Sequence, residues 1–263
     1  MKQMSDVARF TAEADELLAE GDLDAALTHA AAAYGLAEDR PAGRAEAARA
    51  LAAVHLAQGG VEAAGRYASE AVAAFDAEGR DEDPQLAEAL HVSAMTHLHA
   101  RDLAAATPLL ERAAAVLDRV GPRHAFCSIL LTLAEVSLAL GQRDDAEGLL
   151  TRVLDDIQTI TPASEAHAAH LNALNGKAFL GLGGLAVQRD ERDEARDRLS
   201  RAVEFFEAAH GMAHPETVEA LTEVAALYRV LGDEGAADAA DEELSVAERM
   251  LAELDAASAI PRA

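Results

Sequence analysis

The sequence contains no tryptophan, and aromatic residues make up only 3% of its 263 residues. Hydrophobic residues still reach 51%, and alanine is the commonest of them. A chain with so few bulky side chains suits thin layers, in which helices approach closely and each buries a narrow stripe. Only seven prolines occur, and no run alternates β-branched and aromatic residues with polar ones as a strand would. The composition therefore predicts an all-α protein.

Basic residues are also scarce, with 22 lysines and arginines against 47 acidic residues and a net charge of -25. Nucleic acids and anionic membranes both need a basic face, so we expect neither as a partner. Two reasons for this net negative charge remain open: attraction of a basic partner, or simply keeping the protein in solution. No stretch approaches the roughly 20 apolar residues of a membrane span. The single cysteine, Cys127, excludes an internal disulfide, and the N-terminus lacks the apolar core of a signal peptide. We therefore expect a cytoplasmic protein.

A repeat runs along the chain and is marked by six candidate turns between helices. These turn positions, here called anchors, are Gly21, Gly59, Arg101, Gly141, Asp190 and Gly232. Five residues after the anchors stand Ala26, Ala64, Ala106, Ala146, Ala195 and Ala237. Seven residues before them stand Ala14, Ala52, Ala94, Ala134, Gly183 and Ala225. Small residues let two helices cross closely, and glycine ends a helix at low cost, so the pattern predicts six helix pairs.

The pattern resembles the tetratricopeptide repeat (TPR) family. Leu221–Gly232 and Leu133–Gly141 match its first-helix pattern, and Asp145–Leu154 matches its second. The anchors lie 38 to 49 residues apart, which is longer than the roughly 34 residues of the standard unit. With the His214–Thr217 segment, this spacing makes the longer repeats of kinesin light chains the nearest comparison. The resemblance implies a right-handed superhelical solenoid of about six antiparallel helix hairpins.

We expect a single domain over residues 1–263, because no linker or low-complexity tract divides the chain. Helix-breaking residues place the hairpins at about 5–40, 41–80, 84–120, 123–160, 162–210 and 214–257. The fifth unit is longer than its neighbours, so its first helix should be lengthened around Ala163–Gln188.

The family resemblance also implies a concave groove, lined at thirteen, ten, six and three residues before each anchor. The candidate partner-binding residues at these positions are Asp15, Glu46, Arg49, Glu88, His91, Met95, Glu135, Lys177, Glu219, Thr222 and Arg229. His99 joins them because it follows Met95 at the spacing that keeps both on one helical face. Some family members clamp a C-terminal carboxylate with asparagines in this groove. None stands at the matching positions here, which disfavours such a clamp.

The sequence offers no catalytic or cofactor-binding constellation. His91 and His99 lie about 12 Å apart along a helix axis and cannot share one metal ion. His167 and His170 have a chelating spacing, but the H-E-x-x-H pattern is absent, so we interpret them as surface histidines. The glycine-rich segment 181–184 lacks the context of a phosphate loop and indicates close helix packing or local softness. We therefore expect no cofactor, no bound metal and no enzymatic activity.

The leading hypothesis is a protein- or peptide-binding scaffold that holds a basic or amphipathic partner segment in its groove. Such binding could also regulate the curvature of the repeat array. The alternative is a structural protein that forms homo-oligomers by stacking its alanine-rich end hairpin, Ala236–Leu254, on a second copy.

Overall fold

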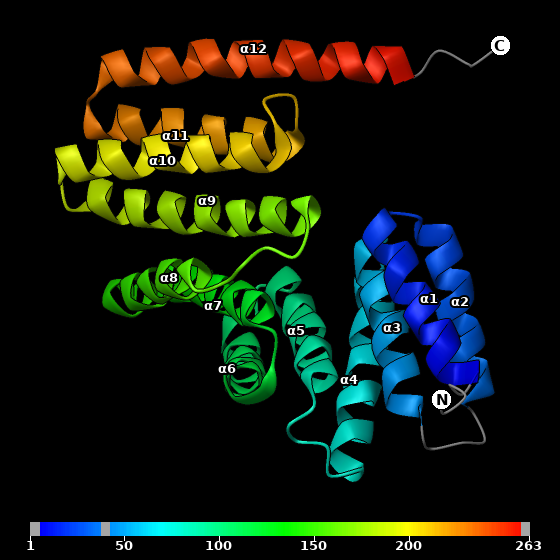
Figure 1. Ribbon diagram of the computed structural model, residues 1–263. Helices are drawn as coiled ribbons and strands as arrows, with labels where there is room; N and C mark the ends of the chain where they lie inside the picture. The colour runs from blue at the N-terminus through cyan, green and yellow to red at the C-terminus, as the bar shows by residue number, and fades with distance from the viewer. Residues whose placement is uncertain (1–5, 38–42, 259–263) are drawn as a thin grey trace. The chain divides into compact units, whose positions relative to one another are not determined.

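The computed structural model describes residues 6–37 and 43–258. Within these ranges the chain is helical and contains no strand (Figure 1). The helices are α1 (Asp6–Glu20), α2 (Leu23–Leu36), α3 (Arg44–Ala57), α4 (Val61–Ala77), α5 (Pro84–His99), α6 (Leu103–Val120), α7 (Arg123–Ala139), α8 (Arg143–Gln158), α9 (Glu165–Gln188), α10 (Arg192–His210), α11 (Pro215–Leu231) and α12 (Glu234–Ser258). The predicted start at residue 5 and the predicted boundary at 40 and 41 lie outside the described residues. The all-α prediction is confirmed.

Several helices begin at a residue whose side chain satisfies a free backbone amide. Asp22 and Asp102 each accept a hydrogen bond from the amide three residues later, over 3.1 Å, and Ser164 does the same at the start of α9. Pro84 and Pro215 open α5 and α11, where the missing amide hydrogen costs nothing. The helix-breaking prolines identified in the sequence therefore mark the starts of α5 and α11.

All six anchors adopt a left-handed backbone at the end of the first helix of a pair. The φ angles are 81° at Gly21, 76° at Gly59, 58° at Arg101, 76° at Gly141, 57° at Asp190 and 73° at Gly232. This conformation stops the helix and reverses the chain within a few residues. The predicted turns are confirmed, including the two that carry no glycine.

The two columns of small residues are buried at the crossings of the helices. The five alanines of the column before the anchors, together with Gly183, are buried, and so are all six alanines of the column after them. Because these side chains are so small, paired helices approach closely, and larger residues such as Phe75 and Leu90 fill the flanking layers. The prediction that the small residues mark helix crossings is confirmed.

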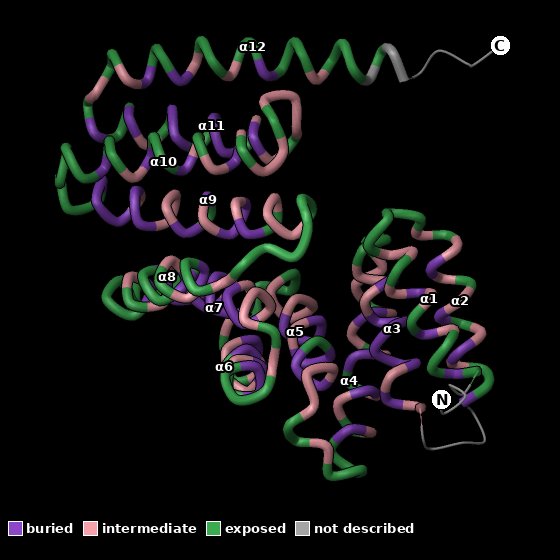
Figure 2. The backbone as a smooth tube through the Cα atoms, viewed as in Figure 1, coloured by how far each residue is buried: buried purple, intermediate pink, exposed green. Residues whose placement is uncertain are grey.

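The chain divides into two compact units, residues 1–129 and 130–263. In the first unit, α1 to α6 form three hairpins, and the first helices α1, α3 and α5 contact one another in order. In the second unit, α9 packs on α10, α11 packs on α12, and α9 also contacts α8 and α11. Figure 2 shows more buried positions on α9 and α11 than on α12, which is largely exposed. The single domain over 1–263 stays a prediction.

Helix α9 is the lengthened first helix expected in the fifth unit, with 24 residues. Two of its glycines lie where α10 comes close. A Cβ atom on Gly183 would stand 2.6 Å from Cδ2 of Leu199, and one on Gly176 would stand 2.9 Å from Cδ2 of Phe206. Both distances are too short for real contacts, so only glycine fits. Close packing therefore explains Gly176 and Gly183, whereas an added Cβ on Gly184 would meet no atom nearer than 4.0 Å.

Candidate functional site

The groove residues predicted in the first unit are joined by ion pairs within that unit. Arg49 of α3 is only 3% exposed. Its Nη2 atom donates to Asp15 of α1 over 2.6 Å, and its Nη1 atom donates to Glu88 of α5 over 2.9 Å. Partial burial raises the pKa of the Glu88 carboxyl, and the charge of Arg49 opposes that rise. Arg49 therefore ties three successive first helices together.

The remaining candidates of this unit also have local explanations. Glu46 accepts a hydrogen bond from Nη1 of Arg80 over 2.6 Å, and Arg80 also binds Asp83 at the start of α5. Burial lowers the pKa of the His91 imidazole. The Nδ1 atom of His99 lies 2.8 Å from the Met95 carbonyl oxygen, within the same helix. Arg49 and Arg80 therefore each hold more than one carboxylate of this unit in place.

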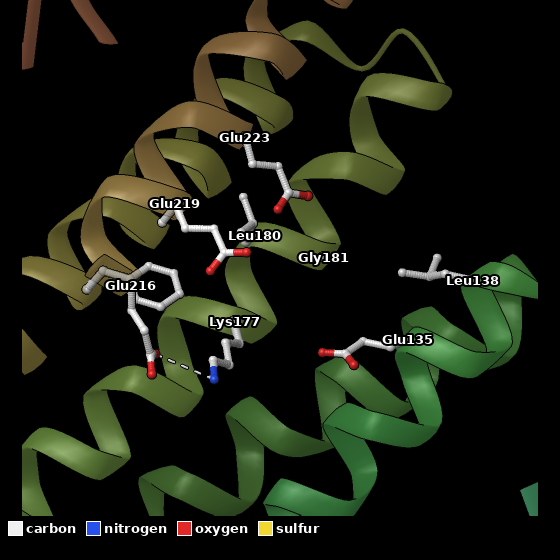
Figure 3. A pocket seen from close by; sticks show the side chains of 10 residues that line it. Glu135, Leu138, Lys177, Leu180, Gly181, Glu216, Glu219 and Glu223 are labelled. Atoms are coloured by element: carbon white, nitrogen blue, oxygen red, sulfur yellow. Dashed lines mark ion pairs between the residues drawn. The ribbon is translucent and has the colours of Figure 1, made fainter. Parts of the chain in front are cut away.

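A recess in the second unit brings together three of the predicted groove residues, Glu135, Lys177 and Glu219 (Figure 3). We call it the acidic recess, and its volume is about 490 Å³. It lies between α7, α9, α10 and α11 and is lined by Glu135, Leu138, Lys177, Leu180, Gly181, Phe206, Glu216, Glu219, Ala220 and Glu223. Four carboxylates therefore surround one ammonium group, beside a wall of apolar side chains.

The side chains of the acidic recess converge from facing helices. Figure 3 shows Glu135 extending from α7 toward Lys177 of α9, with Glu219 and Glu223 on α11 across from it. The Nζ atom of Lys177 lies 3.5 Å from Oε2 of Glu216, and Nε2 of His210 lies at the same distance from that oxygen. Since Lys177 pairs with Glu216, the other three carboxylates are left facing the recess with a net negative charge.

The electrostatics of the recess are unfavourable for its own carboxylates. Burial raises the pKa of Glu135, and the charge of Glu223 raises it further, while Lys177 lowers it. Burial also raises the pKa of Glu223, with a further rise from neighbouring Glu219. Both carboxylates would be stabilised in their ionised form by an additional cation.

The sequence interpretation captured only part of this lining. Thr222 and Arg229 were predicted for the groove, yet neither lines the recess. The Thr222 hydroxyl donates to the Val218 carbonyl, and Arg229 pairs with Asp241 of α12. Glu216, Glu219 and Glu223 lie at i, i+3 and i+7, so they share one face of α11. Counting from the anchors found Glu219 but missed Glu216 and Glu223, which this acidic spacing in the sequence could have indicated.

Nothing in the described ranges 6–37 and 43–258 forms a cluster of three or more residues suited to hold a metal ion. His167 acts at the start of α9, where its Nδ1 atom lies 3.2 Å from the amide nitrogen of Ala163. Cys127 is buried. None of the described helices has the length and apolar character needed to cross a bilayer.

Paired helices, buried small residues at their crossings and left-handed turns between them define the TPR-like class of helical repeat folds. Solved structures agree with this assignment. BtubC (BKLC) from P. vanneervenii is 20% identical, with a TM-score of 0.62, over 99% of this chain and 96% of that one. A Podosopora anserina protein of kinesin light chain type with TPR-like repeats is 22% identical, with a TM-score of 0.57, over 81% and 96% of the two chains.

A third similar structure is a Rap protein complexed with Competence and Sporulation Factor. It is 13% identical, with a TM-score of 0.59, over 95% of this chain and 78% of that one. No family model matches the sequence, and no curated protein does. At these identities the likeness shows the fold alone: the chain has a TPR-like helical repeat fold.

Proposed function

We propose that the chain is a protein-binding scaffold, not an enzyme, and that the acidic recess of its second unit holds a basic side chain of a partner segment. The observation that carries this proposal is the convergence of four glutamates around Lys177 in a recess large enough for several side chains. The Rap protein, which shares the fold, was solved in complex with a factor. That complex supports a binding role for a scaffold of this kind.

Charge is the first argument for a basic partner. Lys177 and Glu216 already form a pair 3.5 Å apart, so Glu135, Glu219 and Glu223 exceed the positive charge available inside the recess. A guanidinium or ammonium group entering the recess would offset their mutual repulsion. At partly screened sites each such contact contributes about 1 kcal/mol.

Apolar lining is the second argument, because it favours an amphipathic segment. Leu138 and Leu180 are partly exposed at the recess, while Phe206 and Ala220 close its base as buried residues. An arginine or lysine places a methylene stem against such a wall while its charged head reaches the carboxylates. A neighbouring apolar residue of the partner would cover Leu138.

The test compares fluorescein-labelled peptides of about 12 residues, one built from arginine, leucine and alanine and one with glutamate in place of arginine. Fluorescence anisotropy should detect binding of the arginine peptide. The Glu219→Gln/Glu223→Gln variant should bind it about tenfold more weakly, through the loss of two charge contacts. The matched control, Asp144→Asn/Asp193→Asn, removes two fully exposed charges of the same unit and should leave the affinity within about twofold.

Equal losses in the two variants would mean general charge attraction and would refute the recess as the site.

A second measurement uses pH. Glu135 and Glu223 have pKa values above the ordinary glutamate value, so they take up protons early as the pH falls. A protonated carboxyl no longer attracts a cation, so affinity should fall as the pH is lowered, and the fall should begin above the ordinary titration range of glutamate. The Glu135→Gln/Glu223→Gln variant should show a flatter pH profile.

A further inference from the structure

The last helix, α12, carries a stripe of exposed apolar side chains that the acidic recess does not use. Val246, Met250 and Leu254 are 42%, 43% and 57% exposed. They are spaced four residues apart, so they lie on one helical face over about 12 Å of axis. We call this face the α12 stripe. Large apolar side chains gathered in this way mark an interaction surface more often than scattered ones do.

The α12 stripe begins beside the face by which α12 packs in its own hairpin and reaches the line of that face at Leu254. Ala237, Ala240 and Ala247 are buried, and α12 packs against α11. Because successive residues are about 100° apart, Val246 lies about 100° and Met250 about 60° around the helix from Ala247. Leu254 lies on nearly the same line as Ala247, seven residues further along, and is exposed there.

Carboxylates border the α12 stripe. Glu242, Glu243 and Glu253 are exposed on the same side of α12, and Arg249 is the only basic residue of the helix. Burial raises the pKa of Glu207 on α10, and the charges of Glu243 and then Glu204 raise it further. Acidic side chains therefore lie beside the stripe: Glu242 and Glu253 along one edge, and Glu243, which is close to Glu207 of α10, among its apolar residues.

We propose that the α12 stripe and its acidic border form a docking surface for a basic amphipathic helix of another protein. A helix is the fitting shape because its apolar residues recur at the same spacing as Val246, Met250 and Leu254. Its basic residues would face Glu242, Glu243 and Glu253. A second copy of this chain fits less well, because pairing two such faces would bring acidic borders together in a protein of net charge -25.

This surface goes beyond the acidic recess, since none of the residues that line the recess belongs to α12. Two partner segments could bind the second unit at once, or one partner could bind at either place. The two proposals can therefore fail independently, and the experiment must separate them.

The probe is a synthetic helix of about 18 residues with leucine on one face and lysine on the others, compared with its leucine–glutamate counterpart. Isothermal titration calorimetry should show binding of the lysine helix to the wild-type chain and none of the glutamate helix. The Val246→Ser/Met250→Ser/Leu254→Ser variant should bind the lysine helix at least about tenfold more weakly. All three side chains are exposed, so the variant should fold normally, which circular dichroism will verify.

Two further variants serve as controls for this measurement. Val230→Ser/Leu140→Ser removes exposed apolar side chains outside the stripe and should change the affinity by less than about twofold. Glu219→Gln/Glu223→Gln alters the acidic recess and should leave binding of the lysine helix intact. If the recess variant loses binding while the stripe variant keeps it, the α12 proposal is overturned and the recess proposal stands.

Sedimentation velocity tests the remaining occupant, a second copy of the chain. Between about 1 and 100 μM the wild-type chain should remain monomeric, because these faces repel one another. A dimer that the triple serine variant dissolves would assign the α12 stripe to self-association and refute the proposed partner.

Discussion

At the scale of single residues, the left-handed backbone at Arg101 and Asp190 carries a cost that glycine would avoid. In this region the Cβ atom of an L-residue crowds the carbonyl oxygen that follows it, at about 1–2 kcal/mol. Both turns nevertheless adopt φ values close to those of the four glycine anchors. The packing of the hairpins therefore imposes the conformation on whichever residue stands there.

Arg101→Gly should accordingly stabilise the fold by about 0.5–1 kcal/mol, after allowance for the greater freedom of glycine in the unfolded chain. Arg101 is exposed, so little contact is lost. Urea unfolding measures the change. Arg101→Ala is the matched control, because it removes the same charge and keeps the Cβ atom. An equal gain in both variants would attribute the effect to charge and contradict the backbone explanation.

Two neighbouring glycines of α9 should respond oppositely to the same substitution. At Gly183 an added Cβ would stand 2.6 Å from Cδ2 and 2.9 Å from Cγ of the fully buried Leu199, so Gly183→Ala should destabilise by about 1–3 kcal/mol. At Gly184 the nearest atom, Cδ1 of Leu227, lies 4.0 Å away. Gly184→Ala should therefore stabilise by up to about 1 kcal/mol through helix propensity. Thermal unfolding that ranks the two in reverse would refute this packing argument.

At the scale of helices, the first helices are joined by side chains as well as by packing. Arg49 connects α1, α3 and α5 through Asp15 and Glu88, two carboxylates that are themselves partly exposed. Because water can resolvate those carboxylates, the pairs contribute less than fully buried ones would. The Arg49 guanidinium itself is buried, so water cannot resolvate it in the same way.

Arg49→Met keeps the buried volume and removes both ion pairs, so it should destabilise the first unit by about 1–3 kcal/mol. Arg112→Met provides the comparison, because Arg112 pairs with Asp76 on an exposed surface, where the loss should stay below about 1 kcal/mol. Hydrogen exchange in α1 and α5 should rise only in the Arg49 variant. Equal effects in the two variants would mean that burial adds nothing to the Arg49 contacts.

Helix α11 shows how far sequence reasoning reaches and where it stops. Its turn at Gly232 and the buried Ala225 follow from a local repeat, so both could be predicted. Counting back from the anchor predicted Glu219 as a groove residue, and the structure places it in the lining of the recess. Phe206 could not be foreseen, because it enters from α10 and its place depends on how two hairpins stack. The ion pairs of Arg49 could not be foreseen either, because their carboxylates come from neighbouring hairpins.

At the scale of the whole molecule, the excess of acidic residues is the dominant electrostatic feature, with a net charge of -25. Arginines such as Arg80, Arg112 and Arg189 neutralise some carboxylates through ion pairs. Acidic residues outnumber basic ones by about two to one, so repulsion among the unpaired carboxylates opposes folding.

Screening should relieve that repulsion. Raising sodium chloride from about 20 to 200 mM at pH 7.5 should increase the Tm by about 3 °C, since the Debye length falls below the spacing of most surface carboxylates. Differential scanning calorimetry measures the shift. Near the isoelectric point of about pH 4.6 the same salt step should have little effect. A Tm that falls with salt at pH 7.5 would show that the ion pairs outweigh the repulsion.

Because lysine is nearly absent from the sequence, the acidic recess can be labelled selectively by chemical modification. Lysine occurs only at positions 2 and 177, and the second supplies the ammonium group of the recess. Among the described residues, an amine-directed acylating reagent will therefore modify Lys177 alone, because arginine does not react. The extent of that modification, followed by mass spectrometry, gives a natural one-site footprint of anything that occupies the recess.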